Sequence, residues 1–219
     1  MSTHKQKFEI PLSPNLDSEN ALWVKSIFPV AGLDEAGRGA WAGPVYAAAV
    51  ILRVNNQVQN QLQGVRDSKQ MSVKQREYWA EKIKDIAFAW GIGFADNVEI
   101  DQIGIIASTR LAMSRAIEQL RSIPQHLLID ALRLPKMMIE QTAIIKGDQR
   151  SLSIAAASVL AKTARDIWMR EIAKQYPDYG FAQHKGYGTL LHQAQLIEFG
   201  PSPIHRMSFR PMKAVITSQ

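Results

Sequence analysis

The sequence predicts an α/β fold in which helices pack on the faces of a mixed central sheet. Two neighbouring apolar stretches are typical of a strand pair, and strand and helix patterns then alternate along the chain. The 219 residues are 46% hydrophobic and 21% charged, as in ordinary globular proteins. No internal repeat or change of composition divides residues 28–213. We therefore expect one domain over residues 28–219, preceded by a polar extension over residues 1–27.

The first half of the domain contains three predicted strands and one predicted helix. Residues 28–33 form an apolar strand that ends at an acid pair, and the glycine-rich segment "AGRGAWAGP" forms a loop. Residues 45–54 are almost entirely apolar and predict a buried strand. The segment "DSKQMS" predicts a loop and cap, "VKQREYWAEKIKDIA" a helix, and "FAWGIGFA" a third strand.

The second half predicts two further strands and three helices. An amphipathic helix over residues 101–121 has Asp101 as its cap and Ile103 and Ile106 on its inner face. The run "HLLIDAL" predicts a strand ending at Asp130, and "MMIEQTAIIKGD" one ending at Asp148. A long helix follows over about residues 153–175, with its basic side chains away from the inner face. After the loop "YPDYGFAQHKGYGT", a C-terminal helix over residues 190–199 is closed by "GPSP".

The composition excludes several classes of protein. Without cysteine the chain has neither disulfides nor thiolate zinc sites, so any metal must use oxygen or histidine ligands. No signal peptide or run of about 18 apolar residues is present, and we expect a cytoplasmic protein without membrane contact. The net charge is +6, and the chain from residue 146 onward contains ten lysines and arginines but only five acids. This basic surplus favours a polyanionic partner.

Three predicted strand ends carry acids, namely Asp34 with Glu35, Asp130 and Asp148. If these strands are neighbours, the four carboxylates converge, and their repulsion raises their pKa values unless cations neutralise them. Mg²⁺ or Mn²⁺ could neutralise the carboxylates, because both ions favour oxygen ligands. A cluster of this kind indicates two-metal phosphodiester hydrolysis. A single Asp at a strand end is more often a turn or helix cap. For the adjacent pair Asp34 and Glu35, the residues alone do not decide between a cap and a metal ligand. Agreement among three sites favours the metal centre.

The triplet Gly37-Arg38-Gly39 has two interpretations. It is a flexible turn, or its backbone approaches a sugar or phosphate closely. The stretch matches neither glycine-rich nucleotide motif, so we expect no nucleotide cofactor. His184, His192 and His205 lack the spacing of a short zinc motif, and loop packing or phosphate contact is the favoured interpretation.

Six segments together resemble the successive blocks of bacterial ribonuclease HII, in order and over residues 30 to about 210. They are "GLDEAGRG", "DSK", "LLID", "KGDQRSLSIAAASVLAKTARD", "HKGYGT" and "GPSPIHRMSF". The resemblance implies a ribonuclease H-like fold and a divalent-metal endonuclease that cuts RNA in RNA–DNA hybrids. It also implies incision 5′ to a single ribonucleotide in duplex DNA, leaving 3′-hydroxyl and 5′-phosphate ends.

The resemblance also assigns roles to residues. It implies that Asp34, Glu35, Asp130 and Asp148 are the metal-binding and catalytic carboxylates, and that the backbone of Gly37, Arg38 and Gly39 reads the ribose 2′-hydroxyl. Tyr187 is similar to the family tyrosine that stacks on the deoxyribose after the ribonucleotide. The candidates for phosphate contacts, with solvated surface charge as the alternative, are Lys69, Lys162, Arg165 and Lys185.

Two positions depart from the family pattern. Ala131 follows Asp130 where glycine is usual, which could alter the backbone beside that acid, and Trp41 occupies a loop position that is commonly smaller, where it could pack or touch substrate. Two other functions remain open. A resolvase- or transposase-type nuclease would use similar acids without a ribose reader, and a catalytically silent nucleic-acid binding protein would be expected to have lost an acid. We expect a monomer.

Overall fold

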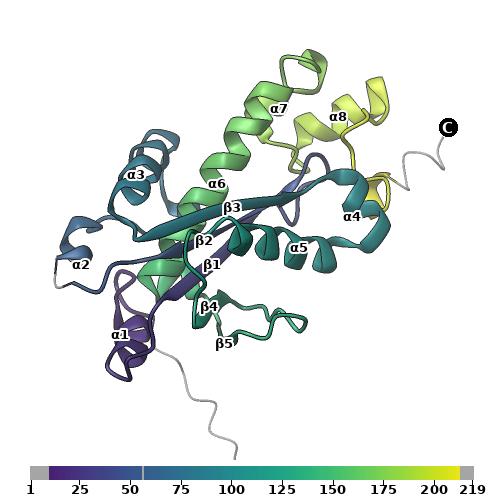
Figure 1. The fold of residues 1–219 in the computed structure, drawn as a ribbon. Coiled ribbons are helices and arrows are strands. Elements are labelled where there is room, and N and C mark those ends of the chain that lie inside the picture. Colours follow the sequence, from purple (N-terminus) through teal and green to yellow (C-terminus); the bar gives the residue numbers. More distant parts are fainter. Residues whose placement is uncertain (1–9, 56, 213–219) are drawn as a thin grey trace, which may run out of the picture.

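The computed structural model describes residues 10–55 and 57–212, and its centre is one five-stranded sheet (Figure 1). The strand order is β3-β2-β1-β4-β5. β1 pairs antiparallel with β2, and β2 with β3, whereas β1 with β4 and β4 with β5 are parallel pairs. The sheet is mixed, which confirms the predicted fold class. The strands are β1 (Val30–Ala36), β2 (Val45–Ile51), β3 (Ala89–Ala95), β4 (His126–Asp130) and β5 (Glu140–Ile144).

Helices cover both faces of this sheet (Figure 1). Helix α5 (Ile105–Glu118) packs on one face of β2 and β3, and helix α6 (Leu152–Ile172) packs on the opposite face of β1 and β2. Helix α3 (Val73–Ile86) lies against α6. The remaining helices are α1 (Asp17–Trp23), α2 (Val58–Gln61), α4 (Asn97–Ile103), α7 (Phe181–His184) and α8 (Leu190–Phe199), with 3-10 turns η1 (Ser68–Gln70), η2 (Gly147–Gln149) and η3 (Pro177–Tyr179).

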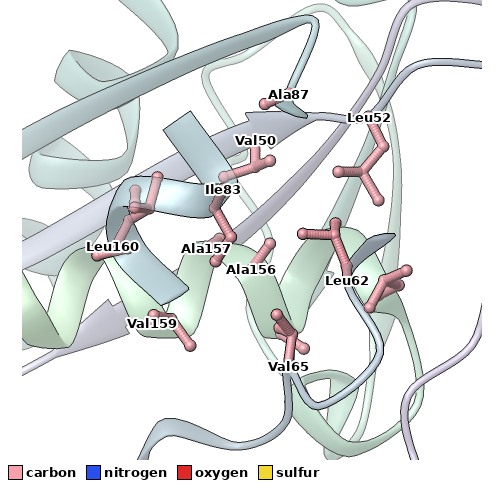
Figure 2. Packing of buried hydrophobic residues seen from close by; sticks show 14 of the residues in the cluster. Val50, Leu52, Leu62, Val65, Ile83, Ala87, Ala156, Ala157, Val159 and Leu160 are labelled. Carbon is pink, nitrogen blue, oxygen red and sulfur yellow. The ribbon is translucent and has the colours of Figure 1, made fainter. Parts of the chain in front are cut away.

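Alternation along β2 gives each face of the sheet its own core. Ala48 and Val50 point toward α6, whereas Ala47 and Ala49 point toward α5. Figure 2 shows the α6 side, where Val50 and Ile83 lie close to small residues of the helix. Alanines on both the strand and the helix allow a close approach of their backbones. The N-terminal end of α6, just after Asp148, is thereby held against β1, which carries Asp34 and Glu35.

The predicted helix over residues 101–121 is two helices, and this part of the prediction is wrong. Gly104, at φ 79°, ends α4 and starts α5 in a new direction. Ile103 and Ile106 are therefore exposed rather than inward. Asp101 is not a cap but lies inside α4, where its carboxylate accepts hydrogen bonds from the backbone of the C-terminal segment. Asp96 caps α4 instead.

Two element ends near the acids also differ from the prediction. β1 continues to Ala36, so Asp34 and Glu35 lie within the strand rather than at its end. β5 ends at Ile144, and Lys146 then adopts a left-handed conformation that turns the chain into η2. Asp148 consequently lies on a 3-10 turn and not on a strand.

Part of the segment predicted as an extension packs on the domain. The Glu19 carboxylate of α1 is buried and accepts hydrogen bonds from the hydroxyls of Ser151 and Ser153, both at 2.6 Å. The domain boundary at residue 28 stays a prediction. Among the helices that the structure describes, none is long and apolar enough to span a bilayer.

Candidate active site

Three of the four predicted acids converge at one end of the sheet, near the C-terminal ends of its inner strands. Asp34 lies on β1, Asp130 ends the parallel neighbour β4, and Asp148 lies on η2. The register that pairs Leu33 with Ile129 places Asp34 beside Asp130. One carboxylate oxygen from each of the three aspartates lies within 4.8 Å of the other two. This grouping, the carboxylate cluster, is a geometry that could hold a divalent cation.

Glu35 borders the carboxylate cluster without joining it. Its Oε1 accepts a hydrogen bond from Arg38 Nη1 at 3.1 Å. Its Oε2 is buried and has no hydrogen-bond partner within the described chain. A buried carboxylate oxygen without a partner carries a desolvation cost that a cation ligand would remove.

Burial and mutual repulsion raise the pKa values of these acids. Burial is the main cause for Asp34, whose pKa lies well above its usual range, and the charges of Glu35 and Asp130 add to it. Burial also raises the pKa of Asp148 to about 6. The pKa values of Glu35 and Asp130 are raised by burial as well. The four carboxylates are therefore poorly stabilised as anions by the protein alone.

Asp67 is a fifth carboxylate beside this cluster, and no predicted strand end marked it. It is buried, its Oδ1 accepts a hydrogen bond from the backbone N–H of Lys69 at 2.9 Å, and its Oδ2 accepts one from Gln149 at 3.4 Å. After burial, its charge is the largest cause of the raised pKa of Asp148. The first residue of the "DSK" block was the available signal. Lys69 lies beside the carboxylate cluster, with its ammonium 3.8 Å from Asp148 Oδ2.

A hollow of about 260 Å³ adjoins the carboxylate cluster along the wall formed by Glu35. It contains most of the residues predicted to bind substrate, and Lys185 and Arg165 do not line it. Lys162 lies 5.4 Å from the centre of the Tyr187 ring and forms an ion pair with Asp166 at 2.6 Å. The predicted residues that line this substrate hollow are Gly37, Arg38, Gly39, Lys69, Lys162 and Tyr187.

The prediction that Arg165 contacts phosphate is wrong. The side chain is fully buried, and its guanidinium donates to the backbone carbonyls of Pro44, Lys185 and Ala42 at 2.9–3.1 Å. The helical pattern placed Arg165 away from the inner face because the sequence does not show that loops cover this part of α6. Lys185 donates to the carbonyl of Ala182 through its ammonium.

A second buried arginine, which the sequence analysis did not single out, holds the glycine-rich loop. Arg206 is fully buried, and its guanidinium donates to the carbonyls of Gly43, Arg38 and Gly37 at 2.9, 2.9 and 2.8 Å. No carboxylate of the described residues lies within 4 Å of this guanidinium, and burial lowers its pKa to about 9. Because the two carbonyls of the triplet point toward Arg206, the loop has one fixed orientation.

The triplet itself requires its first glycine and has two free donors. Gly37 adopts φ 94°, and a Cβ there would lie 2.0 Å from Arg165 Nε. No acceptor for the backbone N–H of Arg38 or Gly39 is found in residues 10–55 and 57–212. These two donors therefore remain available to a ligand at the substrate hollow.

Trp41 packs, one of the two roles expected for it. Its backbone N–H donates to the carbonyl of Gly186 at 2.7 Å, and its ring lies 5.5 Å from the ring of His192. A Cβ on Gly188 would lie 2.1 Å from the indole. Trp41 thus rests on the backbone at either side of Tyr187 and joins the two loops that line the substrate hollow.

The three histidines pack among aromatic side chains, as the sequence favoured over a zinc site. The rings of His184 and His192 stack at 4.3 Å, and His192 Nε2 lies 2.9 Å from His205 Nε2. Burial lowers the pKa values of His192 and His205 to about 4, so both are neutral at pH 7.

The backbone beside Asp130 shows what Ala131 does. Ala131 adopts φ 50°, the left-handed region that favours glycine. The carboxylate of Asp130 nevertheless accepts a hydrogen bond from Gly147 N–H at 2.7 Å and faces the cluster.

Comparisons with known proteins agree with this geometry. A family model described as "Ribonuclease HII" matches residues 31–212. The chain is 50% identical to "Ribonuclease HII" of Synechococcus sp. over 92% of this chain and 90% of that protein, and 46% identical to that of Chloroflexus aurantiacus over 94% and 97%. Ribonuclease H2 from Pyrococcus horikoshii superposes with a TM-score of 0.73 at 25% identity, covering 87% of this chain and 98% of that one. Bst-RNase HIII, solved with Mn²⁺, shares the fold at a TM-score of 0.67 and 18% identity, covering 87% and 70%.

Proposed function

This chain belongs to the ribonuclease HII family, whose members are endonucleases that cut the RNA strand of RNA–DNA hybrids, and we propose that it also incises duplex DNA 5′ to a single embedded ribonucleotide. The products carry 3′-hydroxyl and 5′-phosphate ends. One observation carries the proposal: the carboxylate cluster adjoins a hollow lined by the glycine-rich triplet and Tyr187. Groups suited to hydrolysis and groups suited to ribose recognition thus share one edge of the sheet.

The residues present fit a pair of Mg²⁺ or Mn²⁺ ions. Asp34, Asp130 and Asp148 offer oxygens within 4.8 Å of one another, and Glu35 adds a buried oxygen without a partner. Hard divalent cations prefer such oxygen ligands. When bound, the ions supply an activated water and neutralise the leaving oxygen. Asp34, which is buried and lies beside the other three acids, would be one of the ligands.

The backbone of the triplet is suited to reading a 2′-hydroxyl. Arg206 holds the carbonyls of Gly37 and Arg38, and the N–H groups of Arg38 and Gly39 have no partner in the described chain. A ribose 2′-hydroxyl can accept from such a donor, and deoxyribose offers nothing at that position. A deoxyribose there would leave the donor unsatisfied, which gives discrimination between the two sugars.

Tyr187 and the lysines would position the strand. The Tyr187 ring lines the hollow and is supported by Lys162 and by the guanidinium of Arg165, 5.3 Å from its centre. A ring held in this way can stack on the sugar that follows the ribonucleotide. Lys69 is the phosphate contact that we favour, because its side chain is 78% exposed and lies beside Asp148. Lys162 is less available because it pairs with Asp166.

Cleavage of three matched duplexes tests the proposal. One contains a single ribonucleotide, one is an RNA–DNA hybrid and one is all DNA, each with Mg²⁺ or Mn²⁺ and with EDTA as control. We expect metal-dependent incision 5′ to the ribonucleotide and none of the all-DNA duplex. Equal cleavage of the all-DNA duplex would favour the resolvase or transposase type, and binding without cleavage of any duplex would favour the silent binding protein.

Incision beside an embedded ribonucleotide is the first step of removing it from DNA, so we assign the enzyme to ribonucleotide excision repair. We propose that it acts as a monomer in the cytoplasm, in keeping with the lack of cysteine and the DNA substrate.

A further inference from the structure

Two adjoining hollows lie beside β3, at the end of the sheet away from the acids. One, of about 600 Å³, is bordered by the C-terminal ends of α3 and α5 and by the first half of β3. The other, of about 540 Å³, lies between the end of α1 and the turn after β2. They share Arg53 and Phe88, and together they form what we call the edge groove. The residues that carry its chemistry are Trp23, Arg53, Lys84, Phe88, Trp90 and Arg121.

The edge groove runs along an open strand. β3 is the outermost strand of the sheet, and no strand of the described chain pairs with its outer side (Figure 1). The larger hollow includes residues that point to both faces of β3, such as Gly91 and Ile92, so it follows the edge itself. An open edge presents unpaired backbone groups that can accept an added strand.

The apolar part of the edge groove is exposed and incompletely satisfied. Phe88 and Trp90 expose 43% and 38% of their surface. The indole Nε1 of Trp23 is buried beside the smaller hollow and has no hydrogen-bond acceptor in the described chain. Exposed aromatic rings next to an unsatisfied donor are typical of a surface that a partner covers.

The polar part of the edge groove is basic. Arg53, Lys84 and Arg121 line the larger hollow against a single acid, Asp85. Within the described residues, neither Arg53 nor Arg121 has an acid within 4 Å, and the pair between Lys84 and Glu81 is on the surface. Lys84 also lies 5.5 Å from the Trp90 ring. An occupant that complements this surface carries negative charge beside its apolar side chains.

An occupant of the edge groove would leave the carboxylate cluster free. Ala89 pairs with Ile51, which pairs with Ala31, three residues before Asp34 along β1. The cluster lies toward the opposite end of β1 and across β4, on the other side of the sheet order. Binding of a partner here is therefore compatible with binding of nucleic acid at the acids.

We propose that the edge groove binds an extended, acidic segment of a partner protein. The segment adds as a strand beside β3, places an aromatic or branched aliphatic side chain against Phe88 and Trp23, and directs its carboxylates toward Lys84 and Arg121. A peptide is favoured over single-stranded nucleic acid because the strand edge offers backbone pairing that only a polypeptide can use. The groove also uses α1, which gives the segment before residue 28 a role in recognition.

Selection from a phage-displayed library of random 12-residue peptides tests the proposal. The bait is the full chain, and the double variant Lys84→Glu/Arg121→Glu is screened in parallel. The matched control is Lys136→Glu/Lys174→Glu, which makes the same change of net charge at exposed sites outside the groove. We expect the wild type and the control to enrich peptides that combine Asp or Glu with an aromatic or branched aliphatic residue.

Binding of the most enriched synthetic peptide is then measured with all three proteins. We expect at least a tenfold weaker Kd for the groove variant, a change under twofold for the control, and slower amide hydrogen exchange over residues 88–92 on binding. Enrichment of no acidic peptide, or equal Kd values for the two variants, would overturn the proposal. So would an oligo(dT) strand, or a second copy of this chain, that binds the groove in place of such peptides.

Discussion

Replacing Arg206 by Met should separate the shape of the glycine-rich loop from the stability of the fold. Arg206 does not line the substrate hollow, and its guanidinium reaches the loop through the carbonyls of Gly43, Arg38 and Gly37. Methionine has a similar length and no donor, so the loop loses its three bonds while the space remains filled. The unpaired N–H groups of the triplet are then no longer held toward a ligand.

The effect of Arg206→Met on the free energy of unfolding is the difference between the hydrogen bonds that are lost and the cost of burying the guanidinium charge, which is removed. Three hydrogen bonds from a charged donor contribute roughly 5–9 kcal/mol together. Burial that lowers the pKa of the guanidinium from 12.5 to about 9 costs about 5 kcal/mol at neutral pH. The net loss in Arg206→Met is therefore about 0–4 kcal/mol, which a folded domain can tolerate. The loss in ribose recognition is a separate effect, because a displacement of about 1 Å in a positioning loop costs on the order of 100-fold in rate, which is about 2.7 kcal/mol.

The assay compares kcat/KM on duplexes with and without a single ribonucleotide, beside urea unfolding of the same proteins. We expect Arg206→Met to lower kcat/KM on the ribonucleotide duplex about 100-fold and to reduce the preference for it over DNA. Arg170→Met, which removes an arginine of α6 from its partly exposed ion pair with Glu77 of α3, should change neither. A variant that keeps the wild-type preference, or loses activity only in proportion to its unfolded fraction, would refute the reasoning.

Three further predictions concern residues around the site. Trp41→Ala removes the indole that packs against Gly188 and His192, and it should loosen the loop that carries Tyr187 and raise KM for the ribonucleotide duplex about tenfold with a smaller change in kcat; an unchanged KM in steady-state kinetics would contradict this. Ala131→Gly should relieve the left-handed strain at φ 50° and raise the free energy of unfolding by up to about 1 kcal/mol in urea titration, whereas a loss would show that the strain is absent. The pKa values of His192 and His205 are lowered to about 4, so their contribution to stability is complete above pH 6.5 and is lost as the pH falls toward 4. Between pH 7.5 and 5 the free energy of unfolding of the wild type should fall by about 2–4 kcal/mol more than that of His192→Gln/His205→Gln. Both proteins contain the acids with raised pKa values, so the opposite contribution of those acids cancels in the comparison. Equal losses in the two proteins would contradict the prediction.

The sequence predicted the sheet and the grouping of the acids because both depend on local patterns. Period-two and continuous apolar runs marked all five strands, and acids that follow such runs marked Asp34, Glu35 and Asp130. Asp148 was identified although its element was wrong, because η2 brings it to the same edge as a strand end would. The family resemblance supplied the roles of these residues, which local pattern alone left open.

Contacts between distant segments account for what the sequence could not show. Arg165 has the spacing of an exposed residue on α6, but loops distant in sequence bury it, and its guanidinium donates to the carbonyls of Pro44, Lys185 and Ala42. Arg206 lies more than 160 residues from the carbonyls that it holds, and no local pattern reports such a distance. The break at Gly104 was hidden because apolar residues on either side keep helical spacing.

The most direct test of the central claim is cleavage by Asp34→Asn of the duplex that contains one ribonucleotide. Asparagine keeps the size of the side chain and removes the charge at the centre of the carboxylate cluster. With saturating Mg²⁺ we expect the cleavage rate to fall more than roughly 10³-fold while the Kd for the duplex stays within about threefold, and Glu118→Gln on the exposed end of α5 should behave as the wild type. Cleavage by Asp34→Asn at the wild-type rate would contradict the claim that this cluster performs the hydrolysis.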